Sequence, residues 1–159
     1  MMARKGILGK GTEFWVLHGL TPTLTKLSCL KAFDWGDENY DEYDNNCLDN
    51  ADVATSDFIL GKPGDGSVAI DTDPTNATHL LLLGFADTLE PIGIYAGYSD
   101  GVGVPSLNGN VVELPDTRSW SYATVSLRKG KPVTEANSLV NHTLPLRRQS
   151  RVIDEWKVP

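Results

Sequence analysis

The chain of 159 residues has little of what a nucleic-acid binder or a membrane protein needs. Its 14 basic side chains stand against 21 acidic ones, so the net charge of −7 leaves no basic excess to neutralise phosphates. The longest apolar run, LLLLGF at 80–85, is much shorter than a membrane span, and no signal-peptide apolar region follows the basic residues of MMARKGILGKG at 1–11. We therefore expect a cytoplasmic location and no membrane insertion.

Cysteine and catalytic motifs are scarce as well. Cys29 and Cys47 form no CxxC or other metal-ligand spacing, and in the cytoplasm we expect both to be free thiols. No GxSxG or GxxxxGK[ST] motif occurs, and the three histidines lie apart from one another and outside any HExxH frame: His18, His79 and His142. We expect no enzymatic activity, no cofactor and no bound metal.

What the sequence does contain is a long acidic segment, DWGDENYDEYDNNCLDNAD at 34–52, with eight carboxylates and no Lys or Arg. Charges of one sign at this density repel one another, and buried carboxylates are costly unless paired. The segment is therefore predicted to be a long acidic loop that does not fold on itself and is mobile over residues 37–52 in the monomer. Its aromatic residues indicate contact with a partner surface: Trp35, Tyr40 and Tyr43.

An alternative for this loop is calcium binding. Five carboxylates are close enough in sequence to supply the oxygen ligands: Asp37, Glu38, Asp41, Glu42 and Asp44. Their spacing lacks the Gly at the sixth position and the Glu at the twelfth that an EF-hand loop requires, which favours simple solvation of the carboxylates.

Charge is distributed unevenly along the chain. Residues 1–116 hold 6 basic and 18 acidic groups, whereas residues 117–159 hold 8 basic and 3 acidic groups. Two explanations are open at this point: the opposite charges neutralise each other within one copy, or the acidic surface of one copy meets the basic surface of the next. The second is a head-to-tail contact, which generates rings or filaments.

Short runs of β-branched and aromatic residues, separated by Gly and Pro, predict a mainly β fold of about eight strands. A turn is predicted at 61–66 and an exposed Gly-rich loop at 99–109. Side chains of the segment 119–127 alternate, which places its large aromatics Trp120 and Tyr122 in the core by preference. The predicted strands cover residues 12–18, 23–33, 55–60, 67–70, 91–98, 110–114, 119–127 and 136–146.

One segment has a helical period instead. Asp73 is placed as an N-cap, Pro74 suits the first helical position and Pro91 prevents continuation, so a helix is predicted over about residues 74–89. We expect it to cover one face or end of the sheet, with the leucines at 80–83 in the core. Its predicted apolar face consists of Ala77, Leu80, Leu81, Gly84, Phe85 and Thr88.

Several motifs occur together in the order of one known family. Residues 114–148, LPDTRSWSYATVSLRKGKPVTEANSLVNHTLPLRR, contain one strand with Arg118 and Ser119 near its start and a second that EANSLV introduces. The FWVL run after Gly11 and Thr12, the acidic NYDEYDNNCLDN and the GDGSVAI strand before a helix agree in layout. Together they resemble the major tail tube proteins of long, non-contractile-tailed, lambda-like bacteriophages.

The resemblance implies a single tail tube domain over residues 1–159. The fold would be a β-sandwich or barrel-like structure with one flanking helix at about 74–89 and the long acidic loop at about 34–52. A flexible N-terminal arm at 1–11 and an extended C-terminal arm at about 146–159 would complete it.

The resemblance also implies a structural protein of the virion tail, assembled in the host cell cytoplasm. Copies would form hexameric rings that stack into a tube, in contact with tape-measure, tail terminator and tail-tip proteins. Genomic DNA would pass through the lumen without specific binding, since an acidic lumen repels phosphates. Two alternatives stay open: a monomeric acidic β domain that binds calcium or carbohydrate, and the tube protein of a related contractile or secretion machine.

Two sets of residues follow as candidate assembly contacts. The acidic loop is expected to mediate ring stacking through Trp35, Asp37, Glu38, Tyr40, Asp41, Glu42, Tyr43, Asp44 and Asp49. The basic assembly contact consists of Arg147, Arg148 and Arg151. Equally compatible with the sequence is a basic tail held near the acidic surface of its own copy.

Overall fold

The computed structural model describes residues 6–44, 46–49 and 56–158, which form thirteen strands and one helix. The elements follow one another as β1 (Glu13–His18), β2 (Thr23–Leu27), β3 (Leu30–Asp34), β4 (Glu38–Asp44), β5 (Ser56–Pro63), β6 (Asp65–Asp71), α1 (Ala77–Thr88), β7 (Ile92–Gly97), β8 (Ser106–Asn108), β9 (Val111–Glu113), β10 (Trp120–Leu127), β11 (Pro132–Val133), β12 (Asn141–Arg148) and β13 (Ile153–Glu155).

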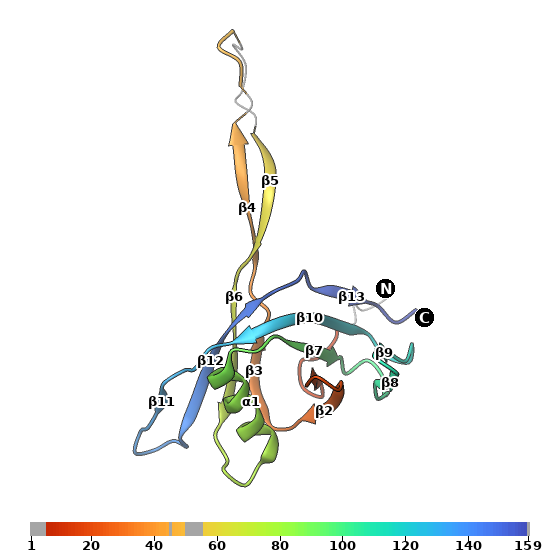
Figure 1. Ribbon diagram of the computed structural model, residues 1–159, viewed down its shortest axis with the longest axis vertical. Coiled ribbons are helices and arrows are strands. Elements are labelled where there is room, and N and C mark those ends of the chain that lie inside the picture. Colours follow the sequence, from red (N-terminus) through yellow and green to blue (C-terminus); the bar gives the residue numbers. More distant parts are fainter. Residues whose placement is uncertain (1–5, 45, 50–55, 159) are drawn as a thin grey trace, which may run out of the picture.

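Nine strands form one antiparallel sheet in the order β2-β1-β7-β10-β12-β6-β3, with β11 beside β12 and β13 beside β10. The sheet curls until its ends approach each other, since the rings of Phe14 in β1 and Phe33 in β3 lie 4.8 Å apart. Helix α1 lies along one side of this body, and β4 and β5 stand off it as a long arm (Figure 1). The mainly β fold with one flanking helix is confirmed.

The core fills the inside of the curled sheet. Because side chains alternate across a strand, each strand turns one face towards this interior. Helix α1 adds Leu82, Phe85 and Ala86 to the same cluster. The fully buried strand residues are Val16, Val68, Ile70, Ile94, Val125, Leu127, Leu144 and Leu146.

Strand β10 has the predicted alternation. Val125 and Leu127 face the core, while Trp120 is buried on the opposite face, where its ring lies 5.4 Å from that of Trp15. Tyr122 is half-buried and stacks on Tyr95 at 5.2 Å. The large aromatics of this strand therefore pack within their own copy.

The helix exists as predicted, but its cap and its buried face differ. Asn76, rather than Asp73, is the N-cap, and its side chain accepts a hydrogen bond from the Thr78 amide at 3.0 Å. Asp73 instead accepts hydrogen bonds from Thr75 in the turn before the helix. Of the predicted face only Phe85 is buried, because consecutive leucines place apolar side chains on every side of the helix. The residues that are buried are His79, Leu82, Phe85 and Ala86.

Two predicted connections also differ. The stretch 23–33 is two strands, because Cys29 adopts a left-handed φ of 57° that sends β2 to β1 and β3 to β6. The predicted turn at 61–66 does not reverse the chain. Instead β5 and β6 follow each other across Gly64 and pair with different partners, β5 with β4 and β6 with β3 and β12.

The remaining differences lie in the predicted loop and arms. Within the Gly-rich loop and the strand after it, β8 and β9 pair as a small hairpin. In the predicted C-terminal arm, residues 146–148 belong to β12, and β13 pairs with β10. Residues 6–11 of the N-terminal arm carry no strand or helix, and the Leu8 carbonyl accepts a hydrogen bond from Ser99 Oγ at 2.6 Å.

The corrected helix face makes a prediction for two neighbouring positions. Leu82→Ala should lower the free energy of unfolding by about 2 to 5 kcal/mol, because Leu82 is fully buried and its removal leaves a cavity. Leu80→Ala, at a position 52% exposed, should change it by less than about 0.5 kcal/mol. Urea titration of both variants measures the difference, and equal effects would contradict the observed face.

Candidate functional site

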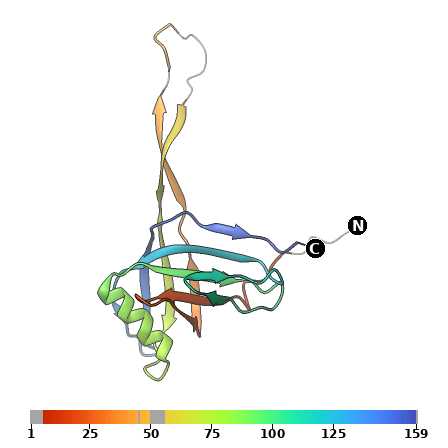
Figure 2. The same cartoon turned by 45° about the vertical axis from the view of Figure 1, so that its right-hand side comes forward.

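Residues 38–44 of the acidic segment form one strand of a β-hairpin rather than a loop. β4 pairs with β5 from Glu38 opposite Pro63 to Asp44 opposite Ser56, in a two-stranded sheet of its own. The hairpin projects far beyond the body in both views (Figures 1 and 2). The prediction that the segment does not fold on itself is wrong for residues 38–44, because β5 pairs with their backbone while most carboxylates stay in water. Residues 45 and 50–52 lie outside the described residues.

The outer part of the hairpin exposes acidic and apolar side chains together. Tyr43 is 58% exposed and Leu48 is fully exposed. Exposed apolar groups that gather in one place mark interaction sites. One acidic residue meets a base that the sequence analysis did not single out, since Lys62 in β5 lies 2.8 Å from Asp41. The exposed acidic residues are Asp41, Glu42, Asp44 and Asp49.

Two glycines let the strands meet closely at the hairpin base. Gly36 has a φ of +77°, which side-chain-bearing residues rarely adopt. Gly64 donates its amide to the Asp37 carbonyl at 2.6 Å, and a Cβ on Gly64 would lie 2.2 Å from the same oxygen. No side chain larger than hydrogen fits at this crossing.

Arg148, at the end of β12, lies beneath the hairpin base. Its side chain is 1% exposed. Nε donates to the Trp35 carbonyl at 2.9 Å and Nη2 to the Gly36 carbonyl at 3.2 Å, while Nη1 lies 3.5 Å from Glu38 Oε1. A planar guanidinium presents several N–H donors in a fixed arrangement, which suits such a set of acceptors.

Glu38 forms ion pairs with two arginines at the hairpin base. Besides Arg148, it lies 3.4 Å from Arg151 Nε and accepts a hydrogen bond from the Tyr40 hydroxyl at 2.7 Å. The Tyr40 hydrogen bond, together with Arg151 and Arg148, lowers the pKa of Glu38 below its usual range. The carboxylate therefore stays ionised at neutral pH, and in turn it raises the pKa of Tyr40.

The predicted site residues thus fall into separate places. Trp35 packs its ring 4.6 Å from Phe33 beside the core, away from the outer hairpin. Arg148 and Arg151 reach the hairpin base of their own chain. Arg147 is exposed and, among the described residues, makes no ion pair. Asp37 is exposed at the base, so the predicted acidic set is divided between base and outer hairpin.

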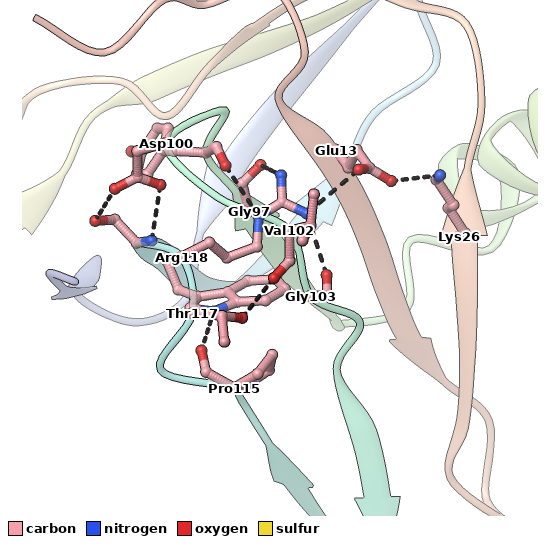
Figure 3. A network of polar contacts seen from close by, with 12 residues as sticks. Glu13, Lys26, Gly97, Asp100, Val102, Gly103, Pro115, Thr117 and Arg118 are labelled. Carbon is pink, nitrogen blue, oxygen red and sulfur yellow. Dashed lines mark hydrogen bonds and ion pairs between the residues drawn. The ribbon is translucent and has the colours of Figure 1, made fainter.

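A second buried arginine organises the opposite end of the sheet (Figure 3). Arg118 is 2% exposed and donates to the carbonyls of Gly97, Tyr98 and Gly103 at 2.8, 2.9 and 3.1 Å. Its guanidinium also lies 3.3 Å from Glu13, whose pKa is lowered by the hydrogen bond from Lys26 and by Arg118 itself.

Aromatic rings cover this guanidinium. The Arg118 Cζ atom lies 5.8 Å from the Trp15 ring and 5.4 Å from the Trp120 ring. Cations over indole faces are attracted by the ring quadrupole, most strongly where water is excluded. The sequence analysis noted Arg118 only as part of a motif, although a basic residue directly before a buried aromatic strand could have indicated this role.

The C-terminal segment joins the same end of the body. Lys157 donates its amide to Ser119 Oγ at 2.8 Å, and the Trp156 ring stacks on Tyr98 at 6.0 Å. Although burial opposes it, hydrogen bonds from Ser119 lower the pKa of Asp100, which anchors the same turn.

The described residues offer little for other kinds of site. Within them, no group of three or more His, Cys, Asp or Glu side chains could hold a metal ion. The two cysteines, Cys29 and Cys47, are exposed free thiols, as predicted. No helix in the described part of the chain is long and apolar enough to cross a membrane.

Solved structures from phage tails and injection machines share this fold. The chain superposes on the sheath/tube terminator of an extracellular contractile injection system (TM-score 0.66, 13% identity, 97% of this chain and 99% of that chain). A chain of the anti-feeding prophage baseplate superposes with a TM-score of 0.62 and 9% identity, over 96% of this chain and 97% of that chain. The SPP1 tail tube protein superposes with a TM-score of 0.59 and 11% identity, over 97% of this chain and 81% of that chain.

These likenesses concern the fold, a β-structured body with one flanking helix. Residues 5–158 match the model of the lambda-like phage tail tube proteins, and the chain belongs to this family. "Structural protein 3" of Pseudomonas phage PAJU2 is 24% identical over 125 residues, which are 75% of this chain and 76% of that protein. The chain is a structural component of the virion tail tube and not an enzyme, which confirms the predicted family, the predicted structural role and the predicted place in the virion tail.

The Arg118 network predicts a large stability effect. Arg118→Met should lower the free energy of unfolding by about 3 to 5 kcal/mol, because Glu13 and the carbonyls of Gly97, Tyr98 and Gly103 lose a buried partner. Arg128→Met is a matched control, since that side chain is 56% exposed and should cost less than about 0.5 kcal/mol. Thermal and urea unfolding of both variants measure the difference. A loss at Arg118 as small as that at Arg128 would contradict the structural role of the Arg118 network.

Proposed function

We propose that copies of this chain form hexameric rings that stack into the tail tube, and that the β4–β5 hairpin of one ring docks on the next ring. The carrying observation is the hairpin itself, which projects from the body with acidic and apolar side chains exposed together. A monomer gains nothing from exposing Tyr43 and Leu48, whereas burial of a leucine or tyrosine against a neighbour is favourable by about 1.5 to 3 kcal/mol.

Charge supports a head-to-tail arrangement of the rings. The hairpin carries Asp41, Glu42, Asp44 and Asp49, whereas most basic residues of the chain lie beyond residue 117. Arg147 is exposed on β12 and Arg151 follows that strand, which makes both available for contacts with a neighbouring copy. Complementary charges steer association and fix register more than they add affinity.

Sheet edges support contacts within a ring. In the described part of the chain, β2 and β3 are the two end strands of the main sheet. β13 pairs with β10 on one side, and its other side is a further open edge. Open edges invite pairing with another chain, and pairing around a ring satisfies them. Copies joined in this way enclose a lumen. The acidic balance of the chain would keep DNA phosphates from binding to its wall, so that DNA slides through without specific contacts.

Other tail components are expected partners at the ends and the centre of the tube. A tape-measure protein would occupy the lumen during assembly, and tail terminator and tail-tip proteins would contact the last and first rings. The solved structures that share this fold include a sheath/tube terminator and a baseplate chain, which is compatible with one fold serving several positions along a tail.

Two fully exposed leucines provide a matched test of the hairpin. Leu48 in the hairpin and Leu20 in the β1–β2 turn are 109% and 107% exposed, so serine at either position should leave the monomer folded. Leu48→Ser with Tyr43→Ser should raise the concentration at which tubes appear by at least about tenfold, the effect of about 1.4 kcal/mol of lost contact. Leu20→Ser should assemble as the unmodified protein does.

Electron microscopy and sedimentation across a concentration series measure this effect. A stronger variant replaces residues 42–59 by Asn-Gly, which joins the paired residues Asp41 and Leu60 by a two-residue turn. It should stay folded and form no tubes at any concentration tested, because only the contact between rings is removed. Regular tubes from this shortened chain would overturn the stacking role of the hairpin.

The basic contact has its own test. Arg147→Glu with Arg151→Glu should prevent tube formation while leaving the far-ultraviolet circular dichroism spectrum and the unfolding midpoint nearly unchanged, because both side chains are exposed. Lys131→Glu is the control, since Lys131 is also exposed and makes no ion pair within the described residues. The single variant Arg147→Glu leaves the Arg151–Glu38 pair intact, so its effect on tube formation reports the contact of Arg147 with a neighbouring copy alone. Normal tubes from the double variant would contradict the assignment.

A further inference from the structure

Among the described residues, no backbone ladder joins the hairpin to the rest of the protein. β4 and β5 pair only with each other, in a sheet separate from the nine-stranded one. Its covalent links are residues 35–37 on one side and Gly64 on the other. A two-stranded hairpin attached through short links is free to swing unless other contacts at its base fix its direction.

Few contacts at the base can do so. A groove of about 400 Å³ opens between the hairpin base and residues 148–151, with Tyr40 and Lys62 on its hairpin side. Close packing therefore does not hold the hairpin against the body on this side. The Gly64–Asp37 hydrogen bond joins the two strands of the hairpin to each other at its root, rather than to the body.

Arg148 connects the hairpin base to the body, beside the Arg151–Glu38 ion pair and the packing of the Trp35 ring against the core. It belongs to β12, which pairs with β6 and β10 in the centre of the sheet. Its donors reach the carbonyls of Trp35 and Gly36 and the carboxylate of Glu38, the first residue of β4. One planar guanidinium thus contacts two residues of the link and the first residue of β4.

We propose that Arg148 is a positioning residue, which fixes the direction of the hairpin in the monomer. The hairpin then already has the direction in which it docks on the next ring. This inference rests on the stacking function proposed above. A binding element held in its bound direction loses less conformational freedom on docking, so it associates at lower concentration. The role requires arginine, because lysine supplies a point charge and cannot donate to two carbonyls and a carboxylate in one plane.

The native cysteines allow a direct measurement of hairpin direction. Cys47 lies beyond the end of β4, Cys29 lies between β2 and β3 in the body, and both thiols are exposed. Spin labels on the two thiols report the distribution of hairpin-to-body distances by pulsed electron resonance. The unmodified monomer should give a narrow distribution. Arg148→Met and Arg148→Lys should each broaden it.

Variants at the surface keep the test independent of core stability. Glu38→Gln removes the charge that Arg148 contacts at a position whose side chain is 29% exposed, and it should broaden the distribution in a well-folded monomer. Glu42→Gln removes one carboxylate from the same strand without touching the base, and it should leave the distribution narrow. A distribution unchanged by Arg148→Lys and Glu38→Gln overturns the proposal.

Assembly separates this inference from the stacking function. Arg148→Lys should raise the concentration at which tubes form by about tenfold or more, the consequence of losing one to two charge-assisted hydrogen bonds. Tubes formed at unchanged concentration by a variant with a broadened distribution would overturn the inference while leaving hairpin stacking intact. If the shortened hairpin still forms tubes, the stacking function fails, whereas the distance measurements retain their meaning for the monomer.

Discussion

Two buried guanidinium groups hold the parts of this chain that leave its sheet. Arg118 and Arg148 each lie where the backbone departs from a ladder, so that the local carbonyls have no strand partner. Buried carbonyls without donors are costly, and an arginine can satisfy several of them at once. Each guanidinium is paired with one half-buried carboxylate, Glu13 or Glu38, rather than with a buried one.

This arrangement explains why the body can carry such irregular attachments. A buried ion pair contributes little net stability, since desolvation offsets attraction, but removal of one partner is strongly destabilising. The two arginines therefore act chiefly on which conformation the attached segments adopt. The segments attached around Arg118 are the turn at 97–103 and, through Ser119, the C-terminal segment. Around Arg148 it is the root of the hairpin.

The sequence predicts the body of the fold well, because its signals are local. Strand periodicity places Val125 and Leu127 in the core, and the helix between Asp73 and Pro91 exists. The buried face of that helix could not be predicted, because LLLL at 80–83 offers an apolar side chain in every direction. The deciding group is the buried His79, whose Nε2 lies 3.0 Å from the Ser28 carbonyl, a contact 51 residues away in sequence.

The site was only half predictable, for a different reason. A strand at 55–60 was predicted and charge density identified the acidic segment, but neither signal indicated that the two pair with each other. Arg147 and Arg148 are equivalent by composition, yet strand alternation distinguishes them: Leu144 and Leu146 are buried, so position 148 of the same strand also faces inward. Applied to β12, that period alone would have separated the buried arginine from the exposed one.

The charge of the hairpin also affects contacts between free monomers. A long two-stranded hairpin exposes two unpaired edges, which are templates for pairing with another copy of itself. At its base the carboxylate of Glu38 is neutralised by Arg148 and Arg151, whereas further out Glu42, Asp44 and Asp49 remain exposed to water. Two hairpins brought side by side would place these like charges within a Debye length of each other. Pairing between identical hairpins is therefore penalised, while docking on a surface of different composition is not. The acidic residues thus act first as protection against the wrong contact, and the exposed tyrosine and leucine can supply attraction once the right surface is reached.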